Sequence, residues 1–128
     1  MMKEFMLLVR NESDRFNGST AEKDKAFLEA CMIYINELKK GGNLISAQPM
    51  VREGKMVSGS ADAFKEGPFS ESREVIVGYY HVLAKDLDEA VSIAKRNPEF
   101  VYTKTARVEV RPIKMKEQAT NYVYPTKT

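Results

Sequence analysis

The histidine at position 81, the only one in the chain, is the residue best suited to acid–base chemistry. It follows Tyr79 by two residues in the apolar run VIVGYYHVLA, and in a β-strand both side chains would leave the same face. A neutral imidazole can act as a general base near pH 7, so His81 and Tyr79 are candidate catalytic residues. The alternative is a polar strand residue that forms a hydrogen bond at a subunit interface. We favour this alternative because the sequence assigns His81 no partner.

Three arginines form a second candidate set. Arg107 and Arg111 alternate with apolar residues in the run ARVEVRPIKM. Arg10 closes the first apolar run of the chain. On adjacent strands, Arg10, Arg107 and Arg111 could line a cleft for an anionic ligand, because guanidinium groups bind carboxylates and phosphates through paired hydrogen bonds. They could equally form a solvated row of cross-strand ion pairs, which we favour because charge rows are common on strands.

Acidic residues surround the tetrapeptide EGPF at positions 66–69. Glu66, Glu71 and Glu74 could do acid–base work or contact a ligand, and we count Glu71 among the candidate ligand-binding residues. Their spacing is not that of an EF-hand loop. With one His and one Cys, a zinc site made by a single chain is not expected, so we predict no metal and no cofactor. The sequence contains no Walker loop, GxGxxG, GxSxG or HExxH motif.

Composition is that of an ordinary globular domain. The chain has 128 residues, 43% of them hydrophobic and 30% charged, with a net charge of +2. No basic cluster is interleaved with aromatic residues, so no nucleic-acid partner is expected. The apolar run before Arg10 is too short for a signal peptide or a membrane span. A single cysteine, Cys31, allows no internal disulfide, so we expect a cytoplasmic protein in which Cys31 is a buried structural thiol.

Apolar periodicity divides the chain into strands and helices. Alternation predicts core strands at residues 4–10, 44–51, 75–84 and 105–113, and three- and four-residue spacing predicts helices at 21–40 and 87–96. Ser19 or Thr20 is expected to cap the first helix and Asp86 the second, which ends at Asn97-Pro98. We also predict a hairpin at residues 52–58 that turns at Glu53-Gly54-Lys55 and pairs with the second strand.

This order predicts an α+β fold of the ferredoxin-like βαββαβ type with an inserted β-hairpin. Both helices would cover one face of an antiparallel sheet, and the first and third core strands would be central. The other face would carry Met6 and Leu8 and would be too apolar to remain exposed. A second copy of the same sheet is the simplest cover, so a homodimer is expected. We place Tyr79 and His81 on this helix-free face.

The tetrapeptide Glu66-Gly67-Pro68-Phe69 predicts a turn within a loop spanning residues 59–72. Gly67 would take backbone angles closed to other residues, Pro68 would fix its own φ, and Phe69 would bury its ring. Followed by GYY, DLDEA and Asn97-Pro98, the motif resembles that of the DGPF, or YCII-related, family of small bacterial proteins, with Glu66 replacing the usual Asp. The resemblance covers about residues 3–115.

The resemblance implies a dimeric α+β barrel at residues 1–115, followed by a C-terminal extension or arm at residues 116–128. It also implies a sigma-factor-like partner in a regulatory accessory role. More distant relatives resemble enzymes with a His at the start of the first helix and an Asp directly before a Pro after the second. Here residues 19–25 contain no His, and Asn97 precedes Pro98. The pair cannot be carried over, so we lean against an enzyme.

We therefore predict a cytoplasmic homodimer that binds a small, in particular an anionic, metabolite in the cleft between two sheets. A cofactor-independent isomerase, lyase or hydrolase using His81 as general base is the first alternative. A protein–protein interaction module, with an exposed Phe69 loop, is the second.

Overall fold

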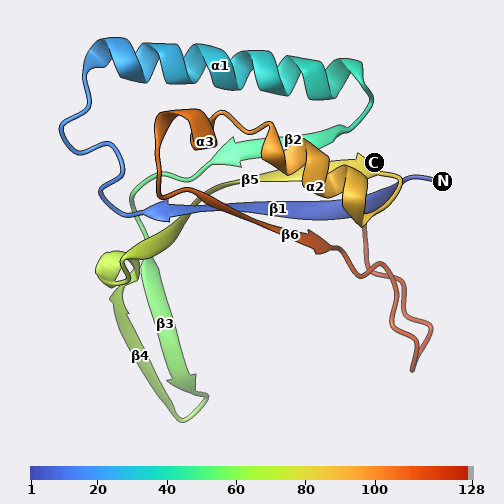
Figure 1. Ribbon diagram of the computed structural model, residues 1–128. Coiled ribbons are helices and arrows are strands. Elements are labelled where there is room, and N and C mark those ends of the chain that lie inside the picture. Colours follow the sequence, from blue (N-terminus) through green and yellow to red (C-terminus); the bar gives the residue numbers. More distant parts are fainter. Residues whose placement is uncertain (127–128) are drawn as a thin grey trace.

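One four-stranded antiparallel sheet, covered on one face by helices, forms the body of the protein in a computed structural model (Figure 1). The structure describes residues 1–126, except for the side chain of Glu71. The elements are β1 (Lys3–Glu12), α1 (Ala21–Lys40), β2 (Leu44–Pro49), β3 (Lys55–Ser60), β4 (Ala63–Pro68), the 3-10 turn η1 (Phe69–Glu71), β5 (Glu74–Ala84), α2 (Leu87–Lys95), α3 (Glu99–Tyr102) and β6 (Arg107–Pro112). The predicted α+β class is confirmed.

The strand order β2–β5–β1–β6 places β1 and β5 at the centre of the sheet, as predicted. Both strands are apolar on both faces, which suits a central position. Phe5, Leu7 and Val9 of β1 are 3% exposed or less and lie on the face that the helices cover. The register sets Met6 opposite His81 and Leu8 opposite Tyr79, so these four residues share the helix-free face.

The helices α1 and α2 begin where the sequence predicts and pack through a narrow apolar stripe, whereas the short helix α3 was not predicted. The Thr20 hydroxyl accepts a hydrogen bond from Lys23 N, and Asp86 caps α2 in the same way. Leu38 of α1 and Ile93 of α2 are at most 2% exposed. Each such burial contributes about 1.5–3 kcal/mol. No helix among residues 1–126 is both long and apolar enough to cross a membrane.

The inserted hairpin lies further along the chain than predicted. β3 pairs with β4, not with β2, and Ser60 opposite Ala63 leaves a two-residue turn at Ala61-Asp62. Gly59 takes a φ of +99°, and a Cβ there would lie 2.1 Å from the carbonyl oxygen of Ala63. The turn therefore needs glycine at 59, and the predicted turn at Glu53-Gly54-Lys55 and return limb at residues 56–58 are wrong.

The EGPF motif is a strand end, not the loop turn that was predicted. Glu66, Gly67 and Pro68 close β4, and Phe69 begins η1. Gly67 is not among the glycines with positive φ, and a Cβ there would meet nothing within 4 Å. The expectation that Gly67 takes a special conformation is therefore wrong. The Phe69 ring is half-buried and packs against the core, as expected.

Two arms project from the body on the side away from the helices (Figure 1). One is the β3–β4 hairpin, in which Met56, Val57 and Phe64 are more than half exposed. The other is the C-terminal segment beyond β6, which folds back on itself through a bridge between Lys116 and Val123. Residues 127–128 of the predicted arm lie outside the described residues.

Candidate functional site

A buried polar cluster lies at the end of β1, where the sequence predicts a solvated loop. Asn11 is fully buried, and its side-chain nitrogen donates to Glu99 Oε1 and to Thr103 Oγ1, both at 2.9 Å. The Thr105 hydroxyl donates to Asn11 Oδ1 at 2.6 Å. Asn11 thus ties β1 to the short helix α3 and the segment after it. Asn97 positions Glu99, because the Asn97 side-chain oxygen accepts a hydrogen bond from Glu99 N at 2.8 Å.

Arg15 completes this cluster with a positive charge. Its Nε lies 2.9 Å from Glu99 Oε1, at an angle that makes a charge contact and not a hydrogen bond. The two side chains are only 14% and 6% exposed. Burial lowers the pKa of Arg15, Glu99 opposes this effect, and the nearby Arg52 adds to the lowering. The guanidinium carbon of Arg15 also lies 4.6 Å from the centre of the Phe16 ring.

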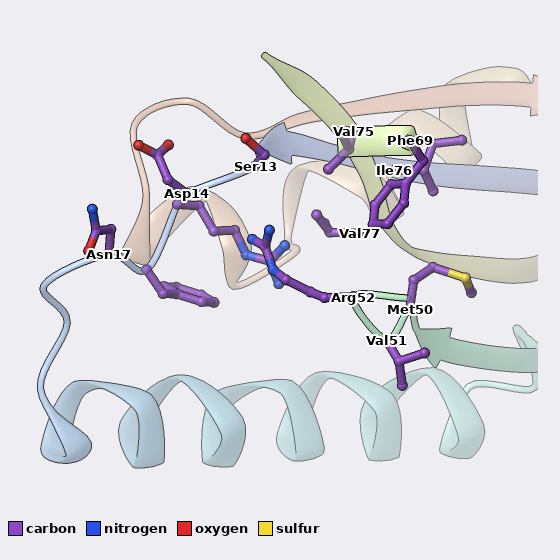
Figure 2. A pocket seen from close by; sticks show the side chains of 12 residues that line it. Ser13, Asp14, Asn17, Met50, Val51, Arg52, Phe69, Val75, Ile76 and Val77 are labelled. Atoms are coloured by element: carbon purple, nitrogen blue, oxygen red, sulfur yellow. The ribbon is translucent and has the colours of Figure 1, made fainter. Parts of the chain in front are cut away.

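Arg15 and Arg52 line one cavity of about 310 Å³, which we call the arginine cavity (Figure 2). Its walls are the loop at residues 13–17, the connector at residues 50–52, Phe69 and the start of β5 at residues 75–77. Figure 2 shows Arg52 reaching into this space, with the Asp14 carboxylate directed away from it. Two positively charged side chains on separate segments therefore meet in one recess.

Backbone hydrogen bonds hold both segments in place. Asn17 N donates to Asp14 O at 2.8 Å, so the loop that carries Arg15 is a tight turn. Met50 N donates to Val77 O at 2.9 Å, which fixes the connector of Arg52 to the central strand β5. Both arginine-bearing segments are therefore held in place by the backbone of the fold.

A second cavity of about 180 Å³ lies between α1 and the sheet, and we call it the helix cavity. Its walls are mostly apolar and include Leu28, Met32, Ile35 and Ala47. Arg15 and Val77 line both cavities, so the two recesses meet at Arg15.

Cys31, Asn97 and Glu99 form a polar part of the helix-cavity wall. Burial, with a smaller contribution from Glu99, raises the pKa of Cys31 to about 11. The thiol is therefore neutral and of low reactivity at physiological pH. Cys31 is half-buried, so the fully buried thiol that the sequence suggests is not what the fold provides.

His81, the candidate base, lies on the helix-free face and lines neither cavity. Its Nε2 is 2.7 Å from Glu4 Oε1, and both side chains are about one-fifth exposed. Glu4 is a carboxylate partner that the sequence analysis did not identify. Tyr79 is half-buried beside Leu8 on the same face.

The three candidate arginines of the strands also lie on or beside the helix-free face. Arg10 Nε lies 3.1 Å from Glu109 Oε1, Arg111 contacts the other oxygen of Glu109 at 3.6 Å, and Arg107 lies 3.2 Å from Glu74. The Arg10–Glu109 pair joins adjacent strands, the Arg107–Glu74 pair spans β1 between β6 and β5, and Arg111 contacts Glu109 along β6 itself. The ligand-binding role of Arg10, Arg107 and Arg111 stays a prediction. Glu71, the fourth candidate, has its side chain outside the described residues.

Of the EGPF residues, only Phe69 reaches the arginine cavity. Glu66 forms an exposed ion pair with Lys55 at 3.1 Å across the hairpin. Within residues 1–126, no three His, Cys, Asp or Glu side chains gather in a way that could hold a metal ion.

An antiparallel sheet with helices on one face, two adjoining recesses and a buried ion pair define a small α+β domain. The model of the YCII-related domain matches residues 3–115, and the chain belongs to this family. No curated protein matches the chain. Asn97, which directly precedes Pro98, lies in the wall of the helix cavity.

The sequence analysis missed the residues that build the site. Asn11 and Arg15 lie between the predicted strand at residues 4–10 and the predicted helix at 21–40, Arg52 begins the predicted hairpin, and Glu99 follows the predicted helix stop. No periodicity relates them. The one available signal is the Asn-Pro-Glu sequence at 97–99, where a side-chain oxygen can start a new helical turn.

Proposed function

We propose that the protein binds a small oxyanion, a carboxylate or a phosphate, in the arginine cavity, as a homodimer that pairs through the helix-free face of the sheet. The meeting of Arg15 and Arg52 in one recess is the observation that carries this proposal. Two like charges repel, and an anion between them removes the repulsion and accepts their hydrogen bonds. Arg15 is held in place by Glu99, while Arg52 is exposed and able to adjust.

The dimer part of the proposal rests on the helix-free face. Met6 and Leu8 line its centre, and Ile76 is 40% exposed. The charged pairs around them carry both signs, so two copies of the face are electrostatically compatible. A stable pair needs about 800 Å² per subunit.

Isothermal titration calorimetry with acetate and with inorganic phosphate at low ionic strength tests the anion site. Arg52→Gln is expected to weaken binding by about tenfold or more, since a hydrogen bond to a charged group contributes about 1.5–3 kcal/mol. Arg73→Gln is the matched control, because Arg73 is 86% exposed and lies outside the arginine cavity. Absence of binding to both anions, or binding that Arg52→Gln leaves unchanged, would refute the proposal.

The contact between His81 and Glu4 favours a second candidate function, a cofactor-independent enzyme. A carboxylate 2.7 Å from Nε2 fixes the orientation of the imidazole ring. Dimerisation would enclose this pair between two sheets. In a screen of small metabolites for turnover, His81→Asn and Glu4→Gln should each abolish an activity that the wild type shows, with the melting temperature retained. Turnover that survives both changes excludes this function.

A further inference from the structure

We infer that the ligand is amphipathic: its oxyanion lies between Arg15 and Arg52, and an apolar ring or short alkyl chain extends past Arg15 into the helix cavity. This inference rests on the proposed function and names the ligand class of the same site. It follows from the position of Arg15, which lines both cavities. An anion bound to the Arg15 guanidinium is therefore at the entrance of the second recess.

The helix cavity has the size and the lining for an apolar group. Its volume of about 180 Å³ exceeds the ~150 Å³ that holds a benzene molecule in an engineered protein cavity. Leu28, Met32 and Ile35 of α1 face Ala47 of β2 across it. Leu28 and Met32 are 60% and 56% exposed, so a ligand would cover apolar surface that the fold leaves in water.

The charges around the helix cavity restrict the ligand further. Glu99 is the acidic residue in its wall, and its carboxylate already accepts from Asn11 and contacts Arg15. A second negative group on the ligand would meet Glu99 in a poorly solvated space, where like charges repel strongly. The class is therefore an oxyanion with one charged end, and a dicarboxylate of similar length is disfavoured.

Calorimetric titration with acetate, benzoate, terephthalate, phenyl phosphate and inorganic phosphate tests the inference. Benzoate should bind the wild type about tenfold or more tightly than acetate, because it buries one ring. Terephthalate, whose second carboxylate lies at the far end of the ring, should bind more weakly than benzoate. Comparison of phenyl phosphate with benzoate identifies which oxyanion the two arginines prefer.

Two variants localise the ring. Ala47→Leu fills the helix cavity and should reduce benzoate affinity to about that of acetate, while acetate binding is unchanged. Ala63→Leu, in the exposed hairpin, is the matched control and should change neither. Since Ala47→Leu could also strain the core, benzoate protection of Cys31 from iodoacetamide in the wild type is a second measurement.

The outcomes separate the inference from the proposed function. If acetate or phosphate binds in an Arg52-dependent way, but benzoate is no tighter and leaves Cys31 unprotected, the inference is wrong and the anion site stands. If benzoate protects Cys31 but Arg52→Gln does not weaken benzoate binding, one ligand does not occupy both cavities, and the inference is wrong. If no oxyanion binds at all, the proposed function fails and the inference fails with it.

Discussion

The two sides of the sheet use arginine in opposite ways. On the helix-free side, Arg10, Arg107 and Arg111 each lie within 4 Å of a carboxylate of the same sheet, and all are partly or largely exposed. On the side of the helices, Arg15 is buried against Glu99, and Arg52 shares a cavity with it. An ion pair exposed to water contributes little to the stability of the fold. A charge in a poorly solvated recess costs free energy to desolvate, and it therefore depends on its specific partner. The candidate site therefore contains Arg15, which is the least exposed of these arginines.

Replacing one arginine on each side of the sheet should give the largest difference in the free energy of unfolding. Arg15→Leu leaves the Glu99 carboxylate buried without its cation and should lower the free energy of unfolding by about 3–5 kcal/mol. Arg10→Leu should lower it by less than about 1 kcal/mol, because the Arg10–Glu109 pair is about one-third exposed. Urea denaturation of the two variants gives both values. Equal losses would mean that the two sides do not differ as described.

Adding a charge to the helix-free face should have the next largest effect. Leu8→Lys would bury an unpaired ammonium group between two sheets and should destabilise the dimer by roughly 2–4 kcal/mol. Val101→Lys, on α3 with Val101 79% exposed, is the control and should be neutral. Light scattering at micromolar concentration measures the outcome. A wild-type protein that is already monomeric there contradicts the proposed use of this face.

The hairpin that projects from the helix-free side offers a smaller contrast between two glycines. Gly59→Val forces a β-branched residue to a φ of +99° and against the Ala63 carbonyl, at a cost of about 1–3 kcal/mol. Gly67→Val should stay within about 0.5 kcal/mol, because its Cβ position is open. Hydrogen exchange of the β3 and β4 amides is the suitable readout, since the hairpin can open without the core. Similar protection in both variants would contradict the assigned turn.

The smallest effect concerns Cys31, on the side of the helices. The folded pKa of about 11 lies above the unfolded value, so burial of the neutral thiol stabilises the fold below about pH 9. This contribution is lost as the pH rises through about 11. At pH 8, iodoacetamide should modify the folded protein roughly 100-fold more slowly than the protein in urea, since two pKa units separate the thiolate fractions. Cys31→Ser removes the signal, and equal rates in both states would contradict the assigned burial.

The sequence predicts the sheet well because the alternation of apolar and polar residues along a strand is a local signal. Both central strands, both long helices and the caps Thr20 and Asp86 can be read from spacing alone. The hairpin prediction is wrong because Glu53-Gly54-Lys55 has the composition of a turn and Gly67-Pro68 that of a loop, whereas the turn follows Gly59, which has a positive φ. The site was missed because Asn11, Arg15, Arg52 and Glu99 come from separate segments that meet only when the sheet has formed.

The position of β1 sets the order in which the protein can fold during synthesis. This strand is made before both of its neighbours, β5 and β6, and Phe5 pairs with Pro112. Until residue 112 has emerged from the ribosome, one edge of this apolar strand has no partner. A nascent chain that has not reached this point would therefore expose a surface prone to aggregation.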